Sequence, residues 1–232
     1  MRGSRVLWTG FALGGISLLV LTACAATKQA AVKEGSCRFL GKECSLLTPG
    51  AEGQAALRYV NRSAQWTQYK KVIIQPVAFF GDEKTKISAS DQQTLTNYFY
   101  QVLQEQLGKK FQIVDEPGPG VMKVEVALDD PEAATPGLRS VSMIVPQVKL
   151  LSMVKQAATG TAPFVGGAQA EARVTDAATG QLLVAAMDRR VGGVSMKAAA
   201  QWQWGDAENA MKAWAEQMAT RLYAATSGAA RP

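Results

Sequence analysis

The sequence predicts an α+β fold, a two-layer α/β sandwich in which a mixed sheet of about four to five strands carries two main helices on one face. The first reason is the order of patterned segments, β-α-β-β-(excursion)-β-β-α, which places both helices on one sheet. The second is the composition: 47% apolar and 19% charged residues are typical of a globular chain and exclude disordered and collagen-like classes. The third is the length of 232 residues, which is enough for one good-sized domain.

The first strand and the first helix are expected between residues 72 and 108. Residues 72–80 are β-branched and apolar on both faces, and Pro76 indicates an end or a bulge within them. Ser90 and Gln93 form a capping box, which is typical of a helix start, and Gly108 ends the helical pattern. The apolar residues that recur at helical spacing in between are Leu95, Phe99, Val102, Leu103 and Leu107.

Two further strands are expected at residues 111–115 and 121–128, joined by a turn-rich segment as an antiparallel hairpin. The helix that precedes them makes the first two strands parallel through a right-handed crossover. In the second hairpin strand, Val124, Val126 and Leu128 share one face. A long excursion over residues 130–166 follows, with a short helix near residues 148–156.

The last two strands, residues 168–176 and 182–190, are expected to form a second antiparallel hairpin around a turn at residues 177–180. The final helix has the best amphipathic pattern in the chain, and a buried Trp214 there would make truncation costly. The apolar positions of this helix are Ala207, Ala210, Met211, Trp214, Ala215, Met218 and Leu222.

The N-terminus is interpreted as an export signal. A basic start precedes an almost wholly apolar run over residues 6–20, with no acidic residue before Cys24. The run is short for a membrane span, which disfavours the alternative of a retained transmembrane helix. The Leu-Thr-Ala-Cys at residues 21–24 resembles the lipobox of bacterial lipoproteins, which implies cleavage before Cys24 and acylation of its sulfur. Ala25 in the next position resembles lipoproteins that two-membrane bacteria send to the outer membrane.

The rest of the chain is expected to hold one globular domain, residues 37–226. Residues 1–23 form the signal peptide, residues 24–36 a flexible lipidated tether, and residues 227–232 a disordered tail. Cys37 and Cys44 are expected to form a disulfide in an oxidising compartment, with two free thiols as the alternative. Their spacing does not match a redox pair, so the bond would staple the start of the domain.

Scattered residues over about 39 to 222 carry a resemblance to a known family. They are Tyr69-Lys70-Lys71-Val72 with Pro76-Val77, Pro117-Gly118-Pro119-Gly120-Val121, Phe164-Val165-Gly166-Gly167, Asp176 with Thr179-Gly180, Trp204-Gly205-Asp206 and Trp214-Ala215. With these residues the chain resembles bacterial lipoproteins of the domain of unknown function 3313 family. The resemblance implies an anchored periplasmic domain and carries no activity, because the family's function is itself unassigned.

The sequence contains few motifs that are typical of catalytic sites. The chain has no histidine, which removes the commonest general base, the commonest zinc ligand and every Ser-His or Cys-His nucleophile. Ser152 and Lys155 match the S-x-x-K pattern of a lysine-activated serine, but about one such match is expected by chance. We therefore expect no catalytic, cofactor-binding or metal-binding residues.

Four carboxylates are candidates for acid–base work, and each has a structural alternative. Asp129 and Asp130 are neighbours whose side chains would point to opposite faces of a strand, so they are expected to end a strand and start a turn. Glu125 and Glu171 lie on polar strand faces, and a cross-strand ion pair with Arg173 accounts for them.

Basic and aromatic residues are further candidates for surface sites. Three basic doublets, residues 70–71, 109–110 and 189–190, could meet anionic lipid or wall polymer, although solvated surface charge accounts for them. Trp202 and Trp204 are either core residues or an exposed recognition pair, and the core is favoured. No basic stripe is interleaved with aromatic residues, so nucleic acid is not an expected partner.

Together these observations favour a non-catalytic binding or assembly module of the cell envelope. It would be held at the outer membrane by lipid on Cys24, with its domain in the periplasm and surface exposure left open. Its expected partners are the membrane, through the anchor, and an envelope protein or wall polymer. The alternative is a wall-polymer hydrolase that uses paired carboxylates, which need no histidine.

Overall fold

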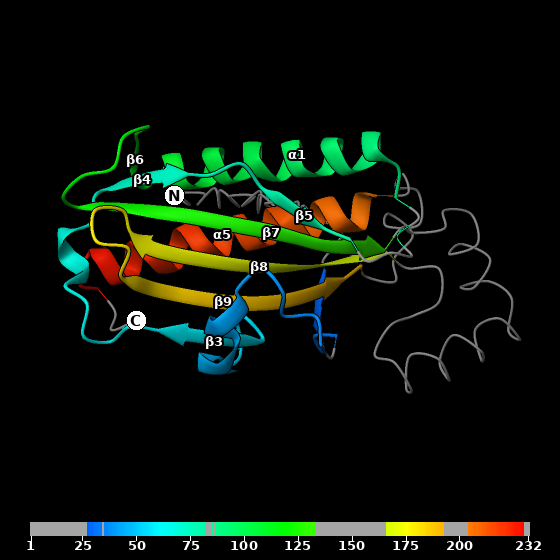
Figure 1. The fold of residues 1–232 in the computed structure, drawn as a ribbon, viewed down its shortest axis with the longest axis horizontal. Coiled ribbons are helices and arrows are strands. Elements are labelled where there is room, and N and C mark those ends of the chain that lie inside the picture. The colour runs from blue at the N-terminus through cyan, green and yellow to red at the C-terminus, as the bar shows by residue number, and fades with distance from the viewer. Residues whose placement is uncertain are drawn as a thin grey trace, which may run out of the picture.

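The computed structural model describes residues 27–33, 35–81, 85, 87–132, 166–192 and 204–229. A sheet forms one layer, and two helices on one of its faces form the other (Figure 1). Cys24, the Ser152 and Lys155 pair, Trp202 and the short helix expected near residues 148–156 lie outside the described residues. Within the described part, no helix has the length and apolar character needed to cross a membrane.

The predicted order of elements is present from β4 to α5, and Pro76 falls between β4 and β5 as expected. The bounds are β1 Lys28–Ala30, η1 Gly41–Leu46, β2 Thr48–Pro49, β3 Leu57–Val60, η2 Trp66–Gln68, β4 Lys71–Ile74, β5 Ala78–Phe80, α1 Ala89–Gly108, β6 Gln112–Ile113, β7 Val121–Glu132, β8 Gly167–Asp176, β9 Leu182–Val191 and α5 Gly205–Thr226.

Among the described residues the sheet has nine strands and is larger than the four to five strands predicted. Its main path is β2-β3-β9-β8-β7-β4-β6, while β1 also pairs with β9 and β5 with β7. The additional strands β1, β2 and β3 are two to four residues long, too short to show the alternation that identifies a strand. Residues 28–30, expected in the flexible tether, instead pair antiparallel with residues 189–191 of β9.

The hairpin predicted for residues 111–128 is wrong. β6 and β7 both run parallel to β4, which lies between them, and only the parallel relation made by the α1 crossover is confirmed. The chain enters β7 at Gly120, whose φ is 71° and whose carbonyl accepts the N–H groups of Lys70 and Lys71. A Cβ on this residue would lie 2.7 Å from the carbonyl oxygen of Gln68, so only glycine fits this close approach.

The two helices follow the predicted apolar spacing. α1 ends at Gly108 as expected, but its N-cap is Ser88, whose side chain accepts the N–H of Asp91 at 3.1 Å. Ser90 therefore lies inside the first turn, because the earlier serine already satisfies that free N–H group. In α5 every predicted apolar position is buried except Met218, which is partly buried.

The core lies between the helices and the sheet. Val124, Val126 and Leu128 of β7 face the helices as predicted, and the ring of Trp214 packs 5.9 Å from that of Phe99, centroid to centroid. Trp204 is 4% exposed, so its core placement is confirmed. The described part of α5 thus joins the sheet and α1 in a single apolar core.

Tyr69 and Asp176 form a buried polar pair beside the β8–β9 turn. The Tyr69 hydroxyl donates to Asp176 Oδ2 at 2.8 Å, and Asp176 Oδ1 accepts the N–H groups of Ala178 and Thr179. Burial raises the pKa of Tyr69, and the hydrogen bond to Asp176 raises it further, to about 12. Burial alone would raise the pKa of Asp176, but the hydrogen bonds from Thr179, Tyr69 and Ala178 hold it below its ordinary value.

This pair predicts a loss of stability at alkaline pH. The folded state holds the Tyr69 proton more tightly than the unfolded chain does. The stabilisation that this proton gives the fold is therefore complete below the ordinary tyrosine pKa of about 10, and it is lost as the pH rises through about 12. Urea unfolding measured between those two pH values should show that the free energy of unfolding falls as the pH rises. In Tyr69→Phe it should fall less steeply with pH. Tyr59→Phe is the matched control, and an unchanged slope in Tyr69→Phe would contradict this assignment.

Candidate functional site

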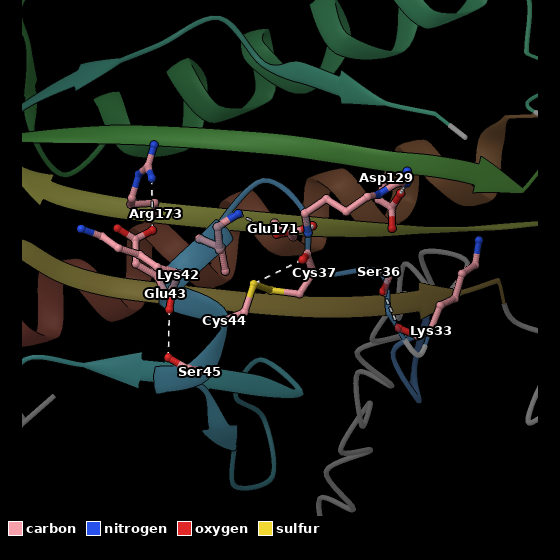
Figure 2. Close-up of a disulfide and its surroundings, with 12 residues drawn as sticks. Lys33, Ser36, Cys37, Lys42, Glu43, Cys44, Ser45, Asp129, Glu171 and Arg173 are labelled. Carbon is pink, nitrogen blue, oxygen red and sulfur yellow. Dashed lines mark hydrogen bonds and ion pairs between the residues drawn. A yellow bond between two sulfur atoms is a disulfide. The ribbon is translucent and has the colours of Figure 1, made fainter. Parts of the chain in front are cut away.

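The disulfide marks a polar cluster on the sheet face that the helices leave free. Cys37 and Cys44 are bonded with an S–S distance of 2.04 Å, which confirms the predicted pairing. The bond closes a short loop in the lead-in segment, residues 35–46, which lies over this face of the sheet (Figure 2). The lead-in segment is therefore part of the folded domain.

Buried carboxylates of the sheet hold this segment in place. Glu171 is 1% exposed, and its two oxygens accept the N–H groups of Arg38 and Leu40 at 2.9 and 3.0 Å. Asp129 accepts the Arg38 guanidinium and the Gln169 amide, each at 2.7 Å. The sequence placed Asp129 at a strand end, but β7 continues to Glu132, because the long partner strand β8 and these two donors make burial of the acid favourable.

The cross-strand ion pair predicted on this face is confirmed for Glu125 and not for Glu171. Glu125 faces Arg173 in the β7–β8 register, and their charged groups approach to 3.2 Å. Arg173 also bonds Glu43 of η1 at 3.1 Å and lies over the ring of Phe39. These contacts fasten η1 to the sheet, so Arg173 serves the same purpose as Glu171.

The polar cluster is best explained as a structural clamp. Both sulfurs and a Glu171 oxygen lie within 4.8 Å of one another, an arrangement that could suggest a metal site. The disulfide already uses both sulfurs, however, and metal ligation requires thiolates. The oxygens of Asp129 and Glu171 accept hydrogen bonds from the protein, so they do not face a substrate.

Opening the disulfide should weaken the fold without abolishing it. The loop between Cys37 and Cys44 is short, so the chain-entropy model gives a loss of about 2.5 kcal/mol for the double change to serine. The Glu171 and Asp129 bonds remain and should keep the segment docked. Urea unfolding of Cys37→Ser/Cys44→Ser measures the loss, and a variant that no longer unfolds cooperatively would contradict the clamp.

A groove lies on the other face of the sheet, beside α5. Seven strands at a spacing of about 4.8 Å span about 29 Å, whereas two helices of about 10 Å each cover about 20 Å. The sheet therefore extends past the second helix at its β3 edge, which Figure 1 shows beyond α5. The space left there is a partly open cavity of about 1050 Å³.

Small side chains make the floor of the groove deep. On the helix-facing side of β8 and β9 the floor residues are Ala170, Ala172, Val174, Val184 and Ala186. Ala172, Val184 and Ala186 stay partly exposed, although they belong to strands that are paired on both sides. Trp66, Trp214, Met218 and Leu222 form the apolar walls. Larger floor residues would fill this space, so the alanines define the groove.

Three arginines line the groove and reach the surface. Arg58 comes from β3, Arg62 follows the end of that strand, and Arg221 comes from α5. Burial lowers the pKa of the Arg58 guanidinium, and the positive charges of Arg221 and Arg62 lower it further. Arg221 donates to the carbonyl of Gly53 at 2.7 Å, and among the described residues none of the three arginines pairs with a carboxylate.

At one end of the groove, Asp188 forms contacts that connect several elements of the fold. It is 4% exposed, and its Oδ2 accepts the indole N–H of Trp214 at 2.7 Å and lies 3.3 Å from Arg190 Nε. Its Oδ1 accepts the N–H of Ala56 and the side-chain amide of Gln29. A single carboxylate thus joins α5, β9, the β2–β3 loop and β1.

Sequence reasoning missed the groove. Its charged residues are far apart in the chain, and the two N-terminal ones follow no periodic pattern. The one signal was the run of alternating alanines at residues 168–172, interpreted simply as strand. Of the basic doublets, residues 109–110 are solvated as expected, whereas Arg189 is 9% exposed and Arg190 lines the groove.

Comparison with known proteins identifies a family. The family model described as Protein of unknown function (DUF3313) matches residues 38–218. No curated protein matches this sequence. Among solved structures, the PelC dodecamer from Paraburkholderia phytofirmans has a TM-score of 0.39 at 7% identity over 69% of this chain and 95% of that chain. A hypothetical protein from Chlamydia trachomatis has a TM-score of 0.32 at 10% identity over 69% and 95%. Neither likeness assigns a function.

Proposed function

The chain belongs to the DUF3313 family, whose function is unknown, and we propose that it is a non-catalytic binding module of the bacterial envelope. The groove beside α5 is the proposed binding site. Lipid on Cys24 anchors the chain at the outer membrane, and the folded domain lies in the periplasm. The observation that carries this proposal is the groove itself, an apolar trough lined by three arginines that form no ion pair with a carboxylate of the described residues.

The groove has the properties of a binding site. Its volume of about 1050 Å³ is close to the upper end of the range for small-molecule sites, about 300–1,000 Å³. Such sites combine apolar walls with a few polar groups that orient the ligand, which here are the arginines. Trp66 and Trp214 also line the groove, and since they are 6% and 7% exposed, each contributes a small part of its ring to the wall.

The candidate carboxylates favour binding over hydrolysis. A wall-polymer hydrolase needs one carboxyl group to protonate the substrate and another to attack it or activate water. Asp129, Glu171 and Glu125 are held by protein donors under the lead-in segment, on the sheet face away from the groove. Two carboxylates line the groove: Asp188 is buried among three hydrogen-bond donors and the Arg190 guanidinium, and Glu216 is exposed on α5. This arrangement gives the hydrolase alternative no support.

A lipid on Cys24 would bring the groove close to the membrane. β1 begins four residues after Cys24 and is paired into the sheet, so the four steps along the chain from Cys24 to Lys28 span at most about 14 Å. Gln29 of β1 bonds Asp188 in the groove wall. The Asp188 end of the groove is therefore the end that the proposed anchor would place nearest to the lipid.

The anchor is tested by Cys24→Ser. Because acylation uses the cysteine sulfur, this variant should lose labelling by an acyl probe and accumulate as an uncleaved precursor. Cys37→Ser/Cys44→Ser is the matched control and should keep its label. Equal labelling of Cys24→Ser and the unchanged chain would contradict the anchor.

The groove is tested by native mass spectrometry of full-length protein extracted from bacterial membranes. The unchanged chain should carry an additional bound mass. Ala186→Trp, which fills the floor, should lose that mass, while Ala178→Trp on the exposed β8–β9 turn should keep it. No bound mass in the unchanged chain, or equal retention by a folded Ala186→Trp, would contradict the proposed site.

A further inference from the structure

We propose that the groove binds a lipid with one acyl chain and an anionic headgroup, the chain lying on the alanine floor and the headgroup at Arg58, Arg62 and Arg221. This inference rests on the function proposed above and names the class of ligand. The groove combines an apolar trough with a cluster of positive charge. A single-chain anionic amphiphile has one apolar part and one negatively charged part, which complement these two features.

The floor is suited to a hydrocarbon chain. Ala172, Val184 and Ala186 expose apolar surface on the helix-facing side of the interior strands β8 and β9. Burying that surface against methylene groups is favourable, and it requires no polar partner. The walls formed by Met218 and Leu222 continue the apolar surface along α5.

The same floor is poorly suited to a peptide. A strand-like peptide gains affinity through hydrogen bonds to an unpaired strand edge. β8 and β9 are interior strands, paired on both sides, so their backbone groups are already satisfied. A peptide lying over them would leave its own amide groups without partners, which is unfavourable in an apolar trough. An acyl chain has no such groups.

The groove carries a net positive charge, which an anionic ligand would neutralise. Of the charged residues that line the groove, Arg190 and Asp188 neutralise each other, and the remaining charges are three arginines and one glutamate, Glu216. Arg58 is half-buried and has two like charges beside it, so an anion there would relieve repulsion as well as form charge-assisted hydrogen bonds. A carboxylate or phosphate headgroup supplies that charge.

The probe is 9,10-dibromostearate, whose bromine atoms quench tryptophan fluorescence on contact. Full-length protein in phosphatidylcholine nanodiscs should show saturable quenching, because Trp66 and Trp214 line the groove. Arg58→Gln/Arg221→Gln should weaken this binding by about tenfold or more, and added salt should weaken it further. Lys71→Gln, an exposed charge outside the groove, is the matched control and should bind as the unchanged chain does. Ala186→Phe in identical discs should lose the saturable part.

The outcomes separate this inference from the function on which it rests. Equal displacement by a neutral monoacylglycerol, or unchanged affinity in the double arginine variant, would overturn the anionic headgroup. If dibromostearate does not quench while native mass spectrometry still shows a mass that Ala186→Trp loses, the ligand class is wrong and the groove remains the site. If neither signal appears, both proposals are wrong.

Discussion

Trp214→Ala is expected to lower the free energy of unfolding by about 3–5 kcal/mol. The side chain is 7% exposed, and its ring packs against Phe99 across the contact between α1 and α5. Its indole N–H also donates to Asp188 Oδ2 at 2.7 Å, so truncation leaves both a cavity and a weakened polar cluster.

Trp214→Phe separates these two contributions. It keeps an aromatic ring in the core and removes the donor, so we expect a smaller loss, about 1–3 kcal/mol. Urea unfolding with the disulfide intact, followed by circular dichroism, measures both variants in a two-state regime. A loss of less than about 1 kcal/mol for Trp214→Ala would contradict the burial described here.

Asp188→Ala is expected to be about as damaging, with a loss of about 3–5 kcal/mol. The change leaves the indole N–H of Trp214, the N–H of Ala56 and the guanidinium of Arg190 without their shared acceptor. Buried donors that lose a charged acceptor bear the full desolvation penalty. Because the carboxylate joins four elements, the loss should extend to the pairing of β1 with β9.

Two variants make this result interpretable. Asp188→Asn keeps an oxygen acceptor and should lose less than the alanine variant, while Asp115→Ala, which removes an exposed acid, should change stability by no more than about 0.5 kcal/mol. Hydrogen exchange should show faster exchange in β1 of Asp188→Ala. Equal stability of Asp188→Ala and the Asp115 control would show that the cluster does not hold these elements together.

The sequence predicted the parts of the fold that have a strong local pattern. α5 repeats apolar residues over twenty-two residues, and β8 and β9 alternate on either side of a turn with glycine at its end, so local sequence alone indicates them. The disulfide was predictable because two cysteines of the expected exported domain had one obvious pairing.

The rest depends on contacts between distant segments. β1 and β2 are ordered by the strands beside them, and their own residues carry no strand pattern. Asp129 is polar in sequence, and it is buried because Arg38 and Gln169, far away in the chain, satisfy it. The groove arises from the width of the sheet relative to two helices, a property that no single segment encodes.

Photo-crosslinking in living bacteria tests most directly that the groove is the binding site. A photoreactive amino acid would replace Thr220, an exposed groove residue on α5, or Ala178 on the β8–β9 turn, in the full-length anchored chain. The binding-module proposal predicts a defined envelope adduct from position 220 that Ala186→Trp abolishes, and no such adduct from position 178. The same products from both positions, or no adduct at position 220, would contradict the proposal.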